Sequence, residues 1–158
     1  MKPFIPWFAG VDVRNNDAVV TTGYSFYWND KVIGPLQGFY QADVYLGHGI
    51  FNKANSLNIA LGRSIRFMRL RVVGNINYHS NDNYAYALQP QLGIGVPALF
   101  EFYMGYNTAI SQVGEMSYQP GLNFTFNIYI IPGIKATAEN MRETYSKGSF
   151  QRWKYGQQ

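Results

Sequence analysis

The chain has 158 residues, of which 17% are aromatic and 14% are charged, against roughly 25% charged residues in ordinary soluble domains. It contains no cysteine, which excludes a disulfide framework, a thiol nucleophile and a thiolate metal site, and we expect neither a metal nor a cofactor. No apolar run of about 18 residues is present, so helical membrane spans are excluded. The formal charge is +4, with basic residues gathered after Pro132, in a segment that suits solvent or lipid headgroups better than nucleic acid.

Eight segments alternate, residue by residue, between large apolar side chains and small or polar ones. A period of two is the period of a β-strand with two different faces. Polar residues, glycine or proline separate the segments, as expected for turns. In chain order the predicted strands are 4–13, 18–29, 37–50, 56–65, 67–79, 84–96, 98–110 and 118–130.

The last segment shows the alternation most fully. One face carries Tyr118, Pro120, Leu122, Phe124, Phe126, Ile128 and Ile130, and the other carries Gln119, Gly121, Asn123, Thr125 and Asn127. Lys and Glu hardly interrupt such segments, so neither face resembles the surface of a soluble sheet.

The pattern predicts an all-β fold, an eight-stranded antiparallel up-and-down transmembrane β-barrel over residues 1–131. Residues 132–158 form a basic C-terminal tail, in which 137–147 would make a short helix. The alternative is a ninth and a tenth strand, at 134–141 and 149–155. Most connections after even strands are short and those after odd strands are polar, which predicts that both ends of the barrel, and the tail, lie in the periplasm.

The polar face is expected to point inward, because the many large apolar residues of the other face would not fit inside an eight-stranded barrel. The alternative is a soluble lipocalin-like binder, with its apolar face inside. Five charged residues belong to the polar face: Asp12, Asp43, Arg69, Arg71 and Glu101. We expect them to form an internal network of ion pairs and hydrogen bonds, the alternative being a pore lining or an acid–base centre.

Candidate catalytic residues are few. The topology places the only two histidines, His48 and His79, at the external rim, and Ser80 and Asp82 follow the second. A His as general base, a Ser as nucleophile or oxyanion donor and an Asp that orients the imidazole could support acyl transfer near the outer leaflet. The same residues also make an ordinary polar loop.

Short stretches resemble a known family. They are Phe-Ile-Pro at 4–6, Tyr-Trp-Asn-Asp-Lys at 27–31 leading to Gly-Phe-Tyr at 38–40, and Gly-Ile-Gly at 93–95. They look like the small eight-stranded outer-membrane barrels and, among these, the PagP-like lipid A palmitoyltransferases. The resemblance implies the barrel fold and an external-rim His, Asp and Ser. Val11 and Val13, and Gly47-His48-Gly49, stand where those catalytic residues would be, so the catalytic residues are not matched.

The function expected is that of an integral outer-membrane barrel of a Gram-negative bacterium, with a plugged polar lumen and a structural or binding role through its external loops. The alternative is an acyltransferase or deacylase of lipid A or phospholipid on the same barrel. Expected partners are membrane lipid or lipopolysaccharide and the barrel assembly machinery, with a monomeric chain and no nucleic acid. The first residues lack the apolar core of a secretory signal, so we expect a mature form with a replaced start.

Overall fold

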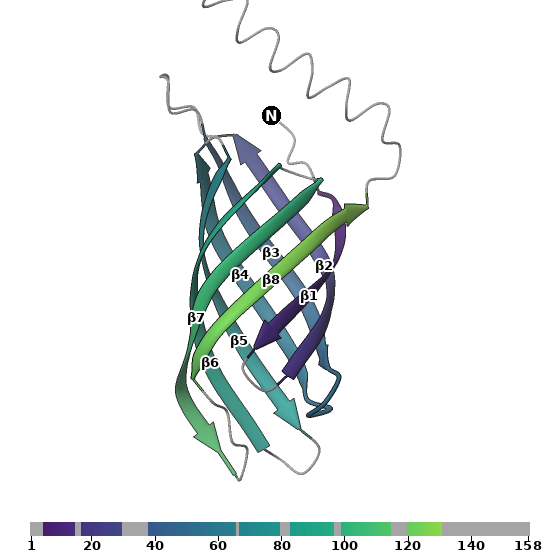
Figure 1. Cartoon of the computed structure of the whole chain (residues 1–158), viewed down its shortest axis with the longest axis vertical. Coiled ribbons are helices and arrows are strands. Elements are labelled where there is room, and N and C mark those ends of the chain that lie inside the picture. Colours follow the sequence, from purple (N-terminus) through teal and green to yellow (C-terminus); the bar gives the residue numbers. More distant parts are fainter. Residues whose placement is uncertain are drawn as a thin grey trace, which may run out of the picture.

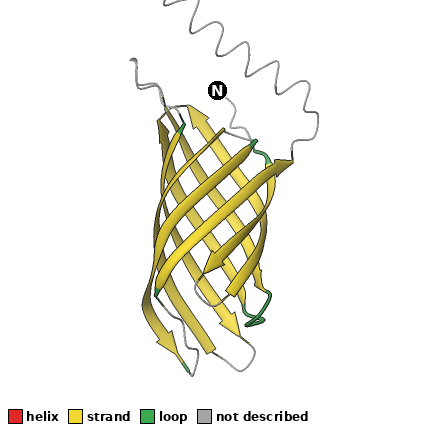
Figure 2. Cartoon of the chain, in the orientation of Figure 1, coloured by secondary structure: helices red, strands yellow, loops and turns green. Residues whose placement is uncertain are grey.

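The computed structural model describes residues 5–14, 17–29, 38–65, 67–79, 83–96, 99–114 and 120–130. These residues form eight β-strands and no helix (Figures 1 and 2). The strands are β1 (Trp7–Arg14), β2 (Asp17–Asn29), β3 (Gly38–Gly49), β4 (Asn55–Ile65), β5 (Met68–His79), β6 (Asn83–Val96), β7 (Phe100–Val113) and β8 (Gly121–Ile130).

Each strand pairs antiparallel with the next, and β8 pairs with β1, so the sheet closes into an up-and-down barrel. The closing register sets Trp7 opposite Ile130 and Arg14 opposite Asn123. The start of β1 and the end of β8 therefore lie at one end of the barrel, the terminus end, at the top of Figure 1. The predicted eight-stranded barrel is confirmed.

The proposed tail at 132–158 lies outside the described residues, and so do the alternatives of a helix at 137–147 or strands at 134–141 and 149–155. No helix that could cross a membrane occurs among the residues that the structure describes.

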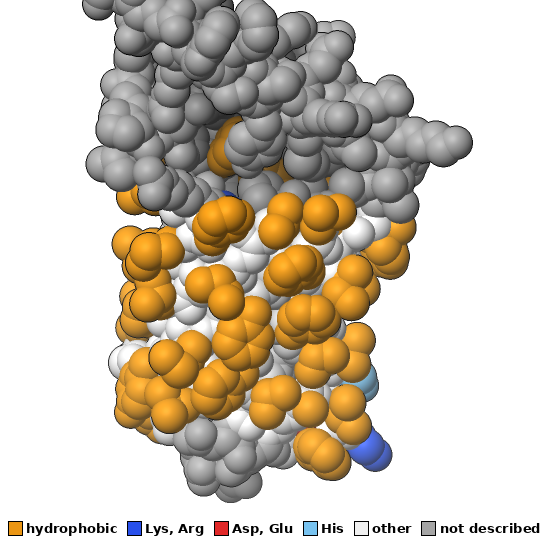
Figure 3. Space-filling model, turned by 45° about the horizontal axis from the view of Figure 1, so that its top comes forward, with side chains coloured by type: hydrophobic (Ala, Val, Ile, Leu, Met, Phe, Trp, Pro, Cys, Tyr) orange, Lys and Arg blue, Asp and Glu red, His pale blue; other side chains and the backbone are white. Residues whose placement is uncertain are grey.

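The predicted assignment of the two faces is correct. Along β8, buried and exposed residues alternate without a break from Gly121 to Ile130. Among the described residues, the buried side chains include nineteen that are polar or charged and ten that are apolar, whereas large exposed hydrophobic residues occur on all eight strands. Figure 3 shows apolar side chains over the visible outer wall of the described strands. The apolar face of a lipocalin-like binder would point inward, and here it points outward.

The end of β7 differs from the prediction because of the local backbone. On β7, Ser111 pairs with Tyr86 and Ala109 pairs with Ala87, so Ile110 is the extra residue of a β-bulge. Ile110 and Ser111 are then both exposed, which breaks the alternation, and the strand continues to Val113 rather than ending at residue 110. In the described part of the chain β8 begins at Gly121, after Pro120, and the predicted strand residues 118 and 119 lie outside the described residues.

Inward-facing glycines make room for aromatic rings rather than for a channel. A Cβ atom on Gly93 would lie 2.5 Å from Cδ1 of Tyr103 and would also meet the carbonyl oxygen of Phe102. In another part of the barrel, a Cβ on Gly23 of β2 would collide with Tyr45 of β3. Tyr103 and Tyr45 are both buried, so the space that these glycines leave is already filled.

Candidate functional site

Among the described residues, charged side chains gather in the lumen, and Arg71 on β5 lies at its centre. The Arg71 Nη1 atom donates to Oδ2 of Asp43 on β3 at 3.0 Å, and its Nε atom donates to Oε1 of Gln91 on β6 at 2.6 Å. The guanidinium carbon lies 3.5 Å from the centroid of the Tyr103 ring. Asp43 also accepts from the Ser25 hydroxyl at 2.6 Å. These buried groups thus connect five strands of the barrel, β2, β3, β5, β6 and β7.

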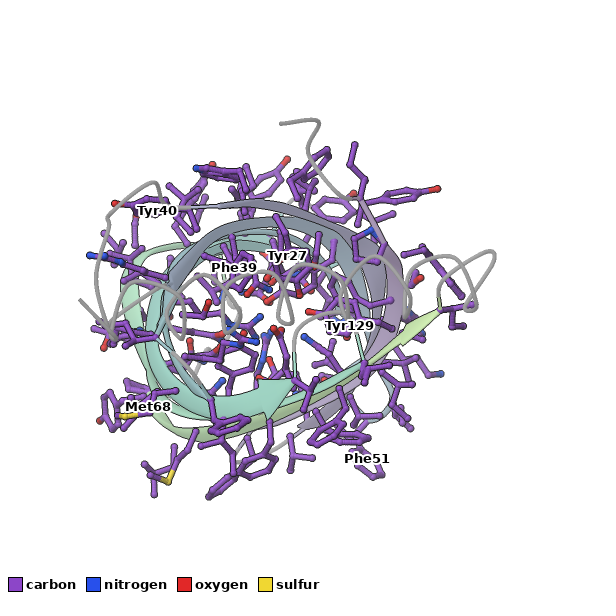
Figure 4. The ribbon with its side chains drawn as sticks, turned by 90° about the horizontal axis from the view of Figure 1, so that it is seen from above. Tyr27, Phe39, Tyr40, Phe51, Met68 and Tyr129 are labelled. Atoms are coloured by element: carbon purple, nitrogen blue, oxygen red, sulfur yellow. The ribbon has the colours of Figure 1, made fainter. Side chains whose placement is uncertain are left out.

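Towards the terminus end, three tyrosine hydroxyls surround the carboxylate of Glu101. It accepts hydrogen bonds from Tyr27 at 3.1 Å, from Tyr103 at 2.8 Å and from Tyr129 at 2.5 Å. The Nε atom of Arg69 lies 3.2 Å from its Oε1 atom. Figure 4, viewed from this end, shows Tyr27 and Tyr129 inside the barrel wall. A carboxylate with this many donors is stabilised without water.

Gln41 on β3 links the two carboxylates. Its Nε2 atom lies 2.9 Å from Oδ1 of Asp43 and 3.1 Å from Oε2 of Glu101. The groups around Arg71 and those around Glu101 therefore form one hydrogen-bonded unit.

At the opposite end of the barrel, the far end, Asp12 is the acidic member of the network. It pairs with Arg14 at 2.8 Å and accepts from the Thr125 hydroxyl at 3.1 Å. Thr125 in turn accepts from Nε2 of Gln91 at 3.1 Å, and Gln91 is the partner of Arg71. A continuous chain of contacts thus runs from Asp12 to Glu101 along the lumen.

All five charged residues predicted for the inner face lie inside the barrel, and the structure adds a sixth, Arg14. The sequence placed Arg14 in a turn because Asn15 and Asn16 follow it, although its spacing of two from Asp12 puts it on the inward face. Three carboxylates now meet three guanidinium groups, so their formal charges cancel. Their side chains are almost completely buried, and such a neutral, interlocked network suits a plug better than an ion path.

The two histidines lie on opposite faces of the barrel wall. His48 is exposed on the outside, where its Nδ1 atom lies 2.8 Å from Oδ1 of Asn55. Asn55 is paired with His48 on one side and with Tyr78 on the other, so the histidines are two strands apart. His79 follows Asn77 at a spacing of two and faces inward at the mouth of the far end, where its buried Nδ1 atom has no hydrogen-bond partner.

The structure therefore does not bring His48 and His79 together. Ser80 and Asp82 lie outside the described residues. Within the described part of the chain, no group of three or more His, Cys, Asp or Glu side chains could hold a metal ion.

One basic residue lies on the outer wall near the terminus end. Arg63 on β4 is paired with Tyr40 on β3, and its guanidinium carbon is 5.4 Å from the centroid of the Tyr40 ring. The sequence placed Arg63 in a turn and gave it no role. The spacing of two from exposed Leu61 is the signal that could have revealed its outward position.

Comparisons with protein-family models, with curated proteins and with solved structures found no match for this chain.

Proposed function

We propose that this protein is an integral outer-membrane β-barrel whose lumen is closed by an ion-paired plug and whose external loops carry a structural or binding role. The observation that carries this proposal is the inverted distribution of side chains: polar and charged groups inside, large apolar groups outside. Soluble monomers rarely expose apolar patches of more than a few hundred square ångströms, because water contact with such a surface is unfavourable. Here exposed apolar side chains occur on all eight strands.

The pairing of the backbone also supports a membrane environment. A closed barrel pairs the peptide groups of every strand with both neighbours, and this is one of the two arrangements that a hydrocarbon layer tolerates. The strands contain 8 to 14 residues, and a tilted spanning strand needs about 9 to 11. An even number of antiparallel strands is the rule for bacterial outer-membrane barrels.

The lumen favours a structural or binding role over transport. The buried chain of contacts from Asp12 to Glu101 fills the axis with side chains that are already paired. In the proposed topology the far end of the barrel, opposite the termini, is the external end. The loops at this end are then the parts of the chain that remain to contact a partner.

The test is refolding from urea with and without detergent micelles, followed by far-ultraviolet circular dichroism and by the gel shift between unheated and boiled samples. We expect β-structure and a heat-dependent shift in micelles alone. Folding to a monomer in plain buffer would overturn the membrane proposal.

The unpartnered Nδ1 atom of His79 at the external mouth favours a second candidate, acyl transfer or deacylation of an outer-leaflet lipid. A His79→Ala variant that refolds normally distinguishes the two. Incubation with radiolabelled phospholipid and lipid A should give a lipid product with the original chain and none with the variant if the barrel is an enzyme. His48→Ala is the matched control, because this residue faces the outside of the wall.

A further inference from the structure

We propose that the connection between β3 and β4, residues 50–54, is a membrane anchor that inserts the side chains of Ile50 and Phe51 into the headgroup region of the lipid leaflet at the far end. This inference rests on the membrane proposal above and names the lipid contact of one loop at that end.

The first two residues of the connection are apolar and exposed. The Phe51 side chain is 71% exposed and that of Ile50 is 52% exposed. Ile50 continues the outward-facing positions of β3 at a spacing of two, after Val44, Leu46 and His48. The apolar outer wall therefore continues, past one polar residue, onto the connection. Contact with water is unfavourable for both side chains, and the lipid that covers the wall is the nearest apolar environment.

Hydrogen bonds to β2 hold the connection in place. The Phe51 N–H group donates to Oδ1 of Asp17 at 2.9 Å, and the Ile50 N–H group donates to the carbonyl oxygen of Ala18 at 2.9 Å. Lys53 has a φ of 53°, in the left-handed region, where the chain turns back towards β4. Because its backbone is already fixed, the connection loses little conformational entropy when its side chains enter lipid.

The connection lies at the depth of the headgroups. β3 contains 12 residues, so its ends are roughly 28 Å apart along the barrel axis, at about 3.3 Å per residue and a strand tilt of about 40°. The apolar band of membrane barrels is about 25 Å tall. The residues that follow Gly49 therefore leave the hydrocarbon and enter the headgroup region.

A row of polar and aromatic side chains on the outer wall borders the connection. His48, Asn55, Tyr78 and Tyr84 stand opposite one another in successive registers from β3 to β6. The rings of Tyr78 and Tyr84 have centroids 5.5 Å apart. Aromatic girdles of this kind lie at the interfaces of membrane barrels. Since Ile50 follows His48 at a spacing of two, the connection extends this interfacial row.

The direction of Phe51 favours a lipid surface over a soluble partner. Figure 4 shows Phe51 outside the ring of strands and not over the lumen. A partner that approaches from the water would have to pass between the barrel and its surrounding lipid to cover this ring.

The experiment measures the depth of single nitroxide labels by electron paramagnetic resonance. The chain contains no cysteine, so one introduced cysteine is labelled at one place. The full chain is refolded into dioleoylphosphatidylcholine vesicles as Phe51→Cys, Lys53→Cys or Leu57→Cys. Collisions of each label with oxygen, which concentrates in lipid, are compared with collisions with a water-soluble nickel chelate. We expect the ratio of oxygen to nickel collisions to be highest at position 57, lower at 51 and lowest at 53.

Lys53→Cys is the matched control, because Lys53 is an exposed residue of the same connection. A ratio at position 51 no higher than at 53 would overturn the anchor, and so would shielding of the label from both collision partners, which indicates a second copy of the chain. Nickel collisions at position 57 as frequent as at 53 would instead refute the membrane proposal, so the two failures are distinguishable. The heat-dependent gel shift verifies folding, and Ile50→Cys replaces Phe51→Cys if that variant does not refold.

Discussion

Replacement of Arg71 by Met removes the central cation of the lumen and provides the sharpest test of the network. The variant loses the ion pair with Asp43 at 3.0 Å, the hydrogen bond to Gln91 at 2.6 Å and the contact with the Tyr103 ring at 3.5 Å. Asp43 then remains buried with neutral donors alone. Breaking a buried pair on one side costs about 3 to 5 kcal/mol, and we expect a loss of this size in the free energy of unfolding.

The assay is a urea titration in micelles, followed by tryptophan fluorescence. The slope of the unfolding free energy against urea concentration is compared between variants. The double variant Asp43→Asn/Arg71→Met should recover about half of the loss or more, because it leaves no lone buried charge. Lys53→Met serves as the control, since this lysine is exposed in the connection between β3 and β4 and its removal breaks no buried ion pair. A cost below about 1 kcal/mol for the single variant, as for a surface pair, would refute the reasoning, and so would a double variant less stable than the single one.

The outer wall, the inner glycines and the closed lumen give further predictions. Ile59→Arg in the middle of the apolar wall should destabilise the barrel folded in vesicles by about 2 to 4 kcal/mol, and Ile65→Arg at the rim by about 0 to 1 kcal/mol. Equal losses of stability in the two variants would argue against a bilayer around this wall. Gly93→Ala should destabilise the barrel by about 1 to 3 kcal/mol in urea titrations, because its Cβ would meet the Phe102 carbonyl, whereas Gly74→Ala, with its nearest atoms at 3.9 Å, should be tolerated. In planar lipid bilayers the original chain should give no stepwise ion current, and steady single-channel steps would contradict the plug.

Strand pattern was the part of the fold that the sequence predicted best, because one face of each strand differs so strongly from the other. In β8 the alternation identifies every inward and outward residue from Gly121 to Ile130. The pattern failed where the backbone departs from it. The bulge at Ile110 leaves two neighbouring residues exposed, so a rule of period two ends the strand there, although hydrogen bonding continues to Val113.

The site was harder to predict than the fold. The alternation along a strand indicates which face of the sheet a side chain lies on, but not which partner it contacts. Asp43 and Arg71 were both assigned to the inner face, but their pairing joins β3 to β5 and depends on strand stagger. The same limit applies to Arg69 and Glu101, which meet from β5 and β7. His48 was grouped with the catalytic candidates by its place at the rim, and its outward direction separates it from the mouth.

The ring of donors around the Glu101 carboxylate bears on how the chain becomes a barrel. This one side chain on β7 takes partners from β2, β3, β5 and β8 as well as from its own strand. No isolated hairpin contains that set, so a partly assembled sheet carries an acid whose partners have not yet arrived. The hydrogen bonds and the ion pair of Glu101 are complete only when the last strand pairs. Partly assembled intermediates are therefore unfavourable, and folding is nearly all-or-none.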